Sequence, residues 1–431
     1  MKTLIREVTV LTLQANDELI RDADVLVDGQ TISYVGPQKL WEENFDRIIN
    51  GRGKLLLPGF VNAHGHAAMT LFRSYADDVP LMDWLEKRIW PVEAKLKRED
   101  VYWGSMLAIL EMIKCGTTTF TDMYFFMDQV AEAAEEAGIR AVLARGLIGI
   151  GQMAEKGLEE SEQFIKTWQG RGNGRITTML GPHAPYTCSP EFLQRVMALQ
   201  ETLAVPIHIH LAETRDEVER ITKEYGVLPT VLLKNIGLLE RPVLAAHCVH
   251  LSVEEMVILK EYNVHVAHNP GSNLKLGSGI APVPELLSRG ITVGLGTDGA
   301  ASNNNLDMIE EMRLAALIHK GSRMDPTVIS AREALAMATR EGAIAVFLEK
   351  VGVVAPEMKA DIIMLDLQRP HLTPQHDLAA HLVYAAQPSD ITMVMVNGQI
   401  LLENGQLTTL DEEKIIFQAQ QRALHLVQQT E

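Results

Sequence analysis

Two histidines separated by one residue, His64 and His66, follow an apolar run that begins at Leu55. If this run is a β-strand, both imidazoles point to the same side, because side chains alternate along a strand. Two imidazoles at a rigid strand end supply half of a tetrahedral zinc site, and neutral imidazole is a common zinc ligand. The pair alone is equally compatible with two ordinary polar residues at a strand end. Further ligands must decide between these interpretations.

Further candidate ligands and proton carriers follow other apolar runs along the chain. Each alone has an ordinary explanation, since a strand histidine is often a packed core residue and an aspartate before glycine often shapes a turn. Together, polar side chains gathered at one end of apolar strands would be costly to bury unless something binds there. The candidates are His183, His210, Glu213, His247, His268 and Asp298.

A site of three histidines and one aspartate offers nitrogen and oxygen ligands to zinc and leaves a position for water. Zinc lowers the pKa of bound water to ~7, so hydroxide becomes available near neutral pH. Glu213, three residues after His210, could move protons while Asp298 contacts metal and water. Spacing does not decide which histidine is the third ligand. His208 shares the face of His210 but is expected to lie deeper, as a packing residue.

The elements that position these residues follow a regular pattern. Short apolar strands alternate with amphipathic helices, which is typical of parallel α/β architecture. Eight such units predict a (β/α)8 barrel, in which the carboxyl ends of the strands form the active site. The predicted helices include 99–114, 190–203, 215–225 and 253–262, and the predicted strands are 55–66, 117–123, 140–149, 176–184, 206–213, 242–250, 264–270 and 292–299.

The two ends of the chain show a different pattern. Both alternate apolar and polar residues, with hairpin turns predicted at Asp28-Gly29 and at Asn397-Gly398. Because each short segment could bury only one face alone, we expect the two ends to meet in one small β-sandwich domain. The predicted division is residues 1–55 and 355–431 for this domain, the latter with a terminal helix, and 56–354 for the catalytic barrel.

Composition excludes several classes of protein. The chain has 431 residues and a formal net charge of -17, with a pI near 5.3, which argues against binding nucleic acid through its phosphates. It has no run of ~18 apolar residues and no signal-peptide pattern, so we expect a cytoplasmic protein without a membrane partner. Three cysteines without CxxC spacing, Cys115, Cys188 and Cys248, predict packed thiols rather than disulfides or a zinc knot.

Five stretches of the chain carry a family resemblance that extends over nearly all of its length: PGFVNAHGHAAMTLFRS, HLAET, AAHCVHL, AHNPGSNLKLGSG and GLGTDGAASNN. The chain resembles the amidohydrolase superfamily, specifically its 5-methylthioadenosine/S-adenosylhomocysteine deaminases. The resemblance implies one divalent metal per subunit, usually zinc or else another divalent transition metal. The implied ligands are His64, His66, His210 and Asp298. Because dimers or larger assemblies are common in the superfamily, we also expect a homo-oligomer.

The resemblance also implies roles in catalysis and substrate binding. Glu213 would protonate a purine ring nitrogen, and His247 would polarise the attacking hydroxide or hold the tetrahedral intermediate. Glu93, in the long loop after the first strand, would accept hydrogen bonds from the ribose hydroxyls. The remaining expected substrate contacts are His183, Arg145 and Trp84. Arg145 is expected to need a partner, because an unpaired guanidinium at a strand end would cost free energy. Trp84, together with Trp90, could form a wall of the pocket.

The predicted activity is hydrolytic deamination of a small-molecule nucleoside, 5'-methylthioadenosine, S-adenosylhomocysteine or adenosine, to the inosine analogue and ammonia. One alternative is a relative acting on a free heterocycle such as guanine, 8-oxoguanine, cytosine or an aminotriazine, which would not need Glu93 and Arg145. Another is a two-metal amide hydrolase, which generally uses a modified lysine on the fourth strand, but residues 176–187 contain none. A non-catalytic scaffold would be expected to have lost metal ligands, and this chain has not. Cytidine deaminase chemistry needs an H-x-E and a P-C-x-x-C pattern, which are absent here.

Overall fold

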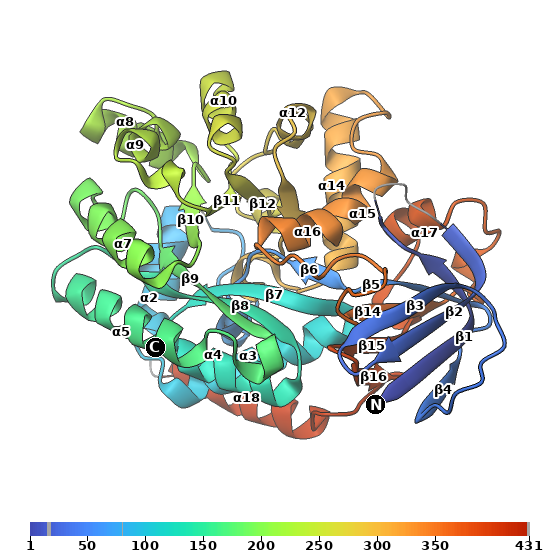
Figure 1. Ribbon diagram of the computed structural model, residues 1–431. Coiled ribbons are helices and arrows are strands. Elements are labelled where there is room, and N and C mark those ends of the chain that lie inside the picture. The colour runs from blue at the N-terminus through green and yellow to red at the C-terminus, as the bar shows by residue number, and fades with distance from the viewer. Residues whose placement is uncertain (15–18, 80, 429–431) are drawn as a thin grey trace.

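The computed structural model describes residues 1–14, 19–79 and 81–428. Its strands form two sheets, one of eight strands and one of nine. In Figure 1 the blue strands from the start of the chain and the red strands from its end lie together beside the larger α/β body. The predicted fold class, a (β/α)8 barrel with a small β domain built from both termini, is confirmed.

The eight-stranded sheet is the barrel, and its strands neighbour one another in chain order. All of its pairs are parallel. The Ala63 N–H donates to the Leu295 carbonyl over 2.8 Å, which joins the last strand to the first. The strands are β6 (Phe60–Asn62), β7 (Thr117–Tyr124), β8 (Arg140–Leu147), β9 (Ile176–Pro182), β10 (Ile207–Leu211), β11 (Val243–His247), β12 (His265–His268) and β13 (Val293–Leu295).

Helices surround the barrel on its outer side (Figure 1). The helices predicted at 190–203 and 215–225 begin as expected because the hydroxyls of Ser189 and Thr214 cap them. They end as expected at Ala204 and Gly226, which adopt the left-handed conformation. The longer helices are α3 (Arg98–Lys114), α4 (Met127–Ala137), α5 (Gln152–Trp168), α7 (Pro190–Leu203), α8 (Arg215–Tyr225), α10 (Val253–Glu261), α14 (Met308–Arg323) and α18 (Glu412–Gln428).

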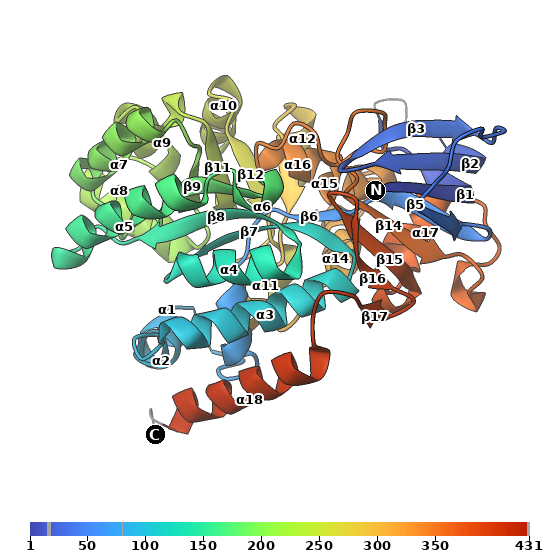
Figure 2. The same ribbon diagram turned by 60° about the horizontal axis from the view of Figure 1, so that its bottom comes forward.

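Shorter helices connect the strands and close the barrel ends. Those that approach the site are η1 (Ala67–Phe72), α1 (Leu81–Trp84), η2 (Leu85–Ile89), α2 (Trp90–Glu93), α11 (Pro270–Lys275) and α13 (Ala300–Asn303). The others are α6 (Arg171–Gly174), α9 (Pro229–Asn235), η3 (Leu238–Glu240), α12 (Val283–Ser288), α15 (Ala331–Met337), α16 (Arg340–Ala345), η4 (Pro370–Leu372), α17 (Leu378–Tyr384) and η5 (Pro388–Asp390). The predicted terminal helix is α18, which runs alongside α3 (Figure 2).

The nine-stranded sheet joins the two ends of the chain, as predicted. Its strand β5 pairs parallel with β1 and antiparallel with β14, so it connects the N-terminal strands to the C-terminal ones. The strands are β1 (Lys2–Leu11), β2 (Leu19–Asp28), β3 (Thr31–Pro37), β4 (Arg47–Asn50), β5 (Lys54–Pro58), β14 (Ile362–Asp366), β15 (Ile391–Val396), β16 (Gln399–Glu403) and β17 (Gln406–Leu407). They share a buried apolar core of their own.

Both predicted hairpin turns are present and they touch each other. Asn397 and Gly398, between β15 and β16, both have positive φ, as a type I′ turn requires. A Cβ atom on Gly398 would collide with the carbonyl oxygen of Gly29, in the turn between β2 and β3. The close approach of these turns therefore requires glycine at position 398.

The first predicted strand, 55–66, is two strands in the structure. β5 lies in the nine-stranded sheet and β6 in the barrel, and Gly59 between them leaves no room for a side chain beside Thr118. The apolar run is buried on both sides in either setting, so hydrophobicity could not reveal the change of sheet. The domain division at residues 55 and 354 stays a prediction.

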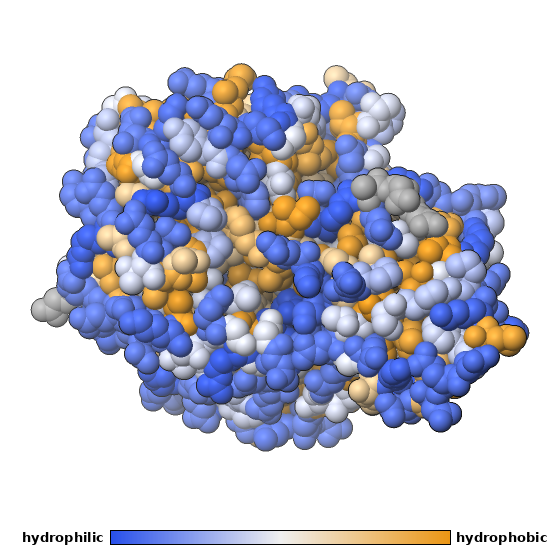
Figure 3. All heavy atoms as spheres, viewed as in Figure 1, coloured by the Kyte–Doolittle hydropathy of each residue, from blue (hydrophilic) through white to orange (hydrophobic). Residues whose placement is uncertain are grey.

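The hydrophilic surface and the burial of the cysteines are consistent with apolar side chains that lie mostly in the interior. The face in Figure 3 is mainly hydrophilic, with apolar atoms in smaller patches. Within the described ranges, no helix has the length and apolar character needed to cross a bilayer. All three cysteines are buried and unpaired with one another, as expected for packed thiols.

Candidate functional site

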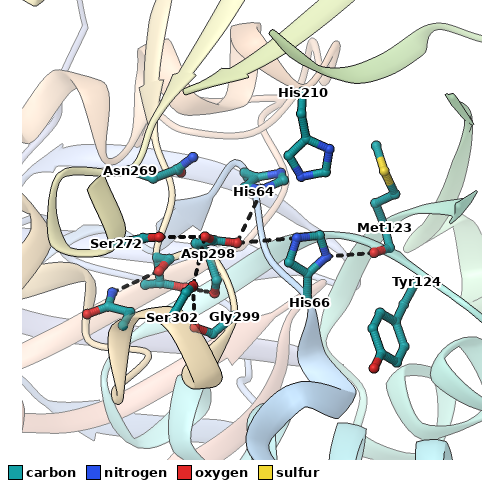
Figure 4. A network of polar contacts seen from close by, with 12 residues as sticks. His64, His66, Met123, Tyr124, His210, Asn269, Ser272, Asp298, Gly299 and Ser302 are labelled. Atoms are coloured by element: carbon teal, nitrogen blue, oxygen red, sulfur yellow. Dashed lines mark hydrogen bonds and ion pairs between the residues drawn. The ribbon is translucent and has the colours of Figure 1, made fainter. Parts of the chain in front are cut away.

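The predicted ligands converge at the carboxyl end of the barrel (Figure 4). His64 and His66 lie just beyond β6, and Asp298 lies just beyond β13. The Oδ1 atom of Asp298 is 3.4 Å from Nε2 of His64 and 3.3 Å from Nε2 of His66. The ring of His210, from β10, is centred 4.8 Å from that of His64. The structure therefore brings together all four residues that the sequence nominates as metal ligands.

Backbone carbonyls fix which nitrogen of each histidine faces the centre of this cluster. Nδ1 of His66 is 2.7 Å from the Met123 carbonyl oxygen, and Nδ1 of His210 is 2.8 Å from the His183 carbonyl oxygen. A carbonyl can only accept, so both Nδ1 atoms donate, and both rings turn their Nε2 atoms toward the centre. Such partners orient the ligating histidines of metal sites.

His208, expected as a deeper packing residue, is fully buried and also contacts the cluster. Its Nε2 is 2.9 Å from Nδ1 of His64. When His64 offers Nε2 to the centre, His208 accepts the proton on the other nitrogen. The sequence signal was the alternation of His208 and His210 on one strand face, but it did not reveal that His208 orients His64.

Asp298 is held by two serines that sequence reasoning did not nominate. The hydroxyls of Ser272 and Ser302 donate to Oδ2 over 2.6 Å and 2.8 Å, which leaves Oδ1 directed at the histidines. Burial alone would raise the pKa of the Asp298 carboxyl, but the close contacts of Oδ1 with the imidazoles of His64 and His66 outweigh it. The pKa lies well below its usual range, so the carboxylate is ionised.

The donor set suits a divalent transition metal. Burial lowers the pKa of His64 to about 4 and that of His210 well below its usual value, so both imidazoles are neutral. Nε2 of His64 and Oδ1 of Asp298 are buried without a hydrogen-bond partner among the described residues. Buried polar atoms rarely stay unpartnered, and a cation would satisfy both.

A second pair, His247 and Glu213, stands beside this cluster. Nε2 of His247 is 3.9 Å from Oε2 of Glu213, and its Nδ1 is 2.8 Å from Oδ1 of Asn273. Burial raises the pKa of the Glu213 carboxyl, which favours a form that can deliver a proton near neutral pH. Burial lowers the pKa of His247, but Glu213 and Asp298 raise it more, so the net shift is upward.

His247 is also close enough to serve as a ligand. Its side chain forms a compact group with those of His64 and His210, in addition to the group of His64, His66 and Asp298. His247 therefore lies within reach of the same centre as the four nominated ligands.

The backbone that carries Glu213 is fixed by Glu217, another residue that was not nominated. Glu217 accepts hydrogen bonds from the N–H groups of Ala212 and Glu213, over 3.0 Å and 2.8 Å, while Ala212 adopts a positive φ. Burial raises the pKa of the Glu217 carboxyl to about 7. The available signal was the Thr214-x-x-Glu217 spacing of a helix start, which indicates a cap and says nothing of a catalytic neighbour.

Two of the predicted substrate contacts lie at the edge of the cluster. Glu93 accepts a 2.6 Å hydrogen bond from the Tyr124 hydroxyl, and the Tyr124 ring is centred 6.3 Å from that of His66. Burial raises the pKa of the Glu93 carboxyl. His183 is centred 4.9 Å from His210, and its Nδ1 contacts the Thr187 hydroxyl over 2.9 Å.

Arg145 does not point at the cluster. Its guanidinium donates to Glu160 on α5, with Nη2 2.7 Å and Nε 3.1 Å from Oε2, and lies 5.7 Å from the ring centre of Phe125. Its strand neighbours Leu143 and Leu147 belong to the core outside the barrel, so Arg145 shares their outward direction. The guanidinium is paired as expected, but with a helix of this chain.

The positions of Trp84 and His268 differ from the expectation that both line the site. Trp84 is 5% exposed and packs in the main core, so it anchors the loop after β6, whereas Trp90 is 39% exposed. His268 faces α14, with its ring centred 5.6 Å from that of His319. Its place at a strand end was recognised, but strand ends carry both inward and outward side chains, and His268 points outward like Val266.

Comparison with known proteins agrees with the geometry. The model of the amidohydrolase family matches residues 55–401. The chain belongs to the amidohydrolase family. It is 56% identical over 426 residues to a 5-methylthioadenosine/S-adenosylhomocysteine deaminase of Pelotomaculum thermopropionicum, covering 98% of each chain. The family resemblance predicted from the motifs is therefore confirmed.

Two solved structures of related proteins support the same family assignment. A zinc-bound adenosine deaminase from Xanthomonas campestris superposes with a TM-score of 0.95 at 34% identity, over 99% of this chain and 98% of that one. The zinc complex of an atrazine chlorohydrolase from Arthrobacter aurescens superposes with a TM-score of 0.91 at 29% identity, over 98% and 100%. Both of these structures hold zinc.

Proposed function

We propose that this amidohydrolase is a zinc-dependent deaminase of 5'-methylthioadenosine and S-adenosylhomocysteine, releasing ammonia and the inosine analogue. One observation carries the proposal: a largely enclosed carboxyl that can hold a proton, Glu213, lies 3.9 Å from His247 beside the histidine cluster and an ionised aspartate. Deamination needs this combination, because water must be activated while the leaving amine is protonated. The high identity to a deaminase of these nucleosides supports the choice of substrate.

The residues that would hold one zinc ion per subunit are His64, His66, His210 and Asp298. The buried and unpartnered Nε2 of His64 and Oδ1 of Asp298 support this assignment, and the zinc in two related structures favours that metal over other divalent ions. When bound, zinc acts as a Lewis acid and lowers the pKa of water to ~7.

Proton movements would be divided between the two carboxyl groups. Water adds to C6 of the purine and Asp298 takes its proton at Oδ1, the oxygen that the serines leave free. Glu213 gives a proton to ring nitrogen N1. The C6–N bond then breaks and ammonia leaves with the proton that Asp298 returns. The proton that remains on the C6 oxygen passes to Glu213, which regains its starting state as the C6=O bond forms. His247 would contact the oxygen that adds to C6 through Nε2 and donate to it when the ring is protonated, a form that the raised pKa of His247 favours.

The sugar and the 5' substituent would be bound at the edge of the cluster. Glu93 uses Oε1 to accept from Tyr124, so Oε2 is the oxygen available to the ribose hydroxyls. His183 uses Nδ1 for Thr187, so Nε2 would face the substrate. Arg145 would meet the carboxylate of S-adenosylhomocysteine only by exchanging its bond with Glu160, which is why we assign it to that substrate alone.

The test is ammonia release by purified, zinc-loaded protein from 5'-methylthioadenosine, S-adenosylhomocysteine, adenosine, guanine, 8-oxoguanine, cytosine and an aminotriazine. Release from the two thio-substituted nucleosides well above that from the free bases is the expected result. Turnover confined to a free base or a triazine would reject the proposed substrate while leaving the metal site in place. The cytoplasmic location and the homo-oligomer stay predictions.

A further inference from the structure

The segment after β12, AHNPGSNLKLGSG, is part of the family resemblance but has no role in the mechanism above. It folds as α11, which enters the barrel mouth directly from the strand end. Its polar side chains are buried to an unusual degree for a short connecting helix: Asn269 and Ser272 are 0% exposed and Asn273 is 1% exposed. Burying such groups costs free energy unless each has a partner, so their partners indicate what the helix is for.

Two adjacent residues of this helix hold two different groups of the reaction. The Ser272 hydroxyl donates to Oδ2 of Asp298 over 2.6 Å, and Oδ1 of Asn273 lies 2.8 Å from Nδ1 of His247. Asp298 follows β13 and His247 ends β11, so no local interaction fixes their relative position. A single helical turn, seated between the two strands, spans the gap.

The helix is itself held rigidly. The N–H of Gly271 donates to Oε2 of Glu311 on α14 over 3.0 Å, and Oε1 of the same carboxyl accepts from Asn303 over 2.7 Å. A side chain on Gly271 would collide with Glu311. At the other end, Nζ of Lys275 donates to Asp77 over 2.6 Å and also bonds to Asn304. The turn therefore cannot shift without breaking several bonds.

We infer that Asn273 is a positioning residue that fixes the tautomer and direction of His247, and that α11 sets the distance between His247 and Asp298. The inference deepens the proposed function and rests on it for the chemical consequence. Two amide groups contact Nδ1 of His247, Oδ1 of Asn273 at 2.8 Å and Nδ2 of Asn269 at 3.3 Å. The shorter contact is to an oxygen, which can only accept, so we assign the proton to Nδ1 of His247, and Nε2 points at the pocket, toward Glu213.

The test compares three substitutions of Asn273 on the same substrate. Asn273→Leu keeps the shape of the side chain but removes the acceptor, and Asn273→Ala removes both. Asn273→Asp keeps an acceptor at Nδ1. We expect kcat to fall by ~10² or more in the first two and to stay within ~10-fold of wild type in the third, with KM and bound zinc retained in all. Ser272→Ala should lower kcat in the same way.

The matched control is Asn263→Asp, the same change at an exposed position between α10 and β12; its kcat should not change. If Asn273→Leu fails to fold, the comparison of Asn273→Ala with Asn273→Asp carries the test. Wild-type kcat in the Leu or Ala variant, or an equal loss in the Asp variant, would overturn the inference.

A second readout does not depend on the substrate. The 15N spectrum of histidine-labelled protein, with the His247 signal assigned by its loss in His247→Asn, should show a proton on Nδ1 in wild type and in Asn273→Asp. The Leu variant should lose this preference. A wild-type protein that deaminates no nucleoside would reject the proposed function, whereas an unchanged tautomer in the Leu variant would reject the inference alone.

Discussion

The carboxyl group of Glu213 lies 3.9 Å from Nε2 of His247, and both side chains are enclosed at the carboxyl end of the barrel. Each changes the protonation of the other. The charge of Glu213 raises the pKa of His247, and His247 opposes the upward shift that burial imposes on the pKa of Glu213. Such mutual dependence is typical of catalytic pairs.

Replacing Glu213 by glutamine should separate proton delivery from metal binding. Glutamine has nearly the same shape but no proton to give to N1, so kcat should fall by ~10² to 10⁴ while bound zinc is unchanged. Steady-state kinetics with metal analysis measure both quantities. Glu219→Gln, on the exposed face of the following helix, is the control and should behave as wild type. Wild-type turnover in Glu213→Gln would remove Glu213 from the mechanism.

Tyr124→Phe should weaken ribose recognition. The change deletes the hydroxyl that donates to Glu93, and a lost hydrogen bond to a charged group is worth ~1.5 to 3 kcal/mol. KM for 5'-methylthioadenosine should rise by roughly 10-fold or more, with a much smaller change for the 2'-deoxy analogue, which offers fewer hydroxyls to Glu93. Equal changes for both nucleosides would show that Tyr124 does not act through the ribose.

Arg145 and Glu160 should discriminate between the two thio-substituted substrates. Arg145→Ala should raise KM for S-adenosylhomocysteine more than for 5'-methylthioadenosine, because only the former carries a carboxylate. Glu160→Gln removes the competing charge and should lower KM for S-adenosylhomocysteine by a few fold. Steady-state kinetics with both nucleosides measure these changes in KM. An equal change for the two nucleosides would reject the assignment of Arg145 to the carboxylate of S-adenosylhomocysteine.

Glu311 should make stability depend on pH. Burial raises its pKa from 4.5 to about 8, so the folded chain binds a proton that the unfolded chain releases between these values. The free energy of unfolding should therefore decrease as pH rises from about 5 to 8. In Glu311→Gln, urea unfolding should show a smaller decrease over that interval, whereas exposed Glu254→Gln should match wild type. An identical slope in both variants would contradict the prediction.

The candidate metal cluster was predictable because its residues follow from the positions of strand ends along the sequence. Strand ends face one side of a parallel barrel, so the candidate histidines and Asp298 could be gathered at one place without knowing any long-range contact. The family resemblance then selected His64, His66, His210 and Asp298 among them. His268 obeys the same rule and yet faces outward, because one residue of register decides the direction. The division of strand 55–66 between two sheets was likewise invisible to hydrophobicity.

The partners of the site residues were not predictable. Ser272 reaches Asp298 and Asn273 reaches His247 across strands far apart in sequence, and Arg145 pairs with Glu160 on a helix. Their residue types are common in turns and at helix surfaces, so composition offers no signal. Only the assembled barrel shows which polar side chain meets which.

Leu57 of β5 pairs with Ile363 of β14, while the same strand borders β1 on its other edge. During synthesis, β5 leaves the ribosome long before β14 does. The edge of β5 that β14 covers therefore stays open until nearly the whole barrel has been made. An uncovered strand edge invites pairing with other chains. The family architecture therefore couples the integrity of the earliest-made segment to the arrival of one of the last, and a chain cut short before residue 362 would expose that edge permanently.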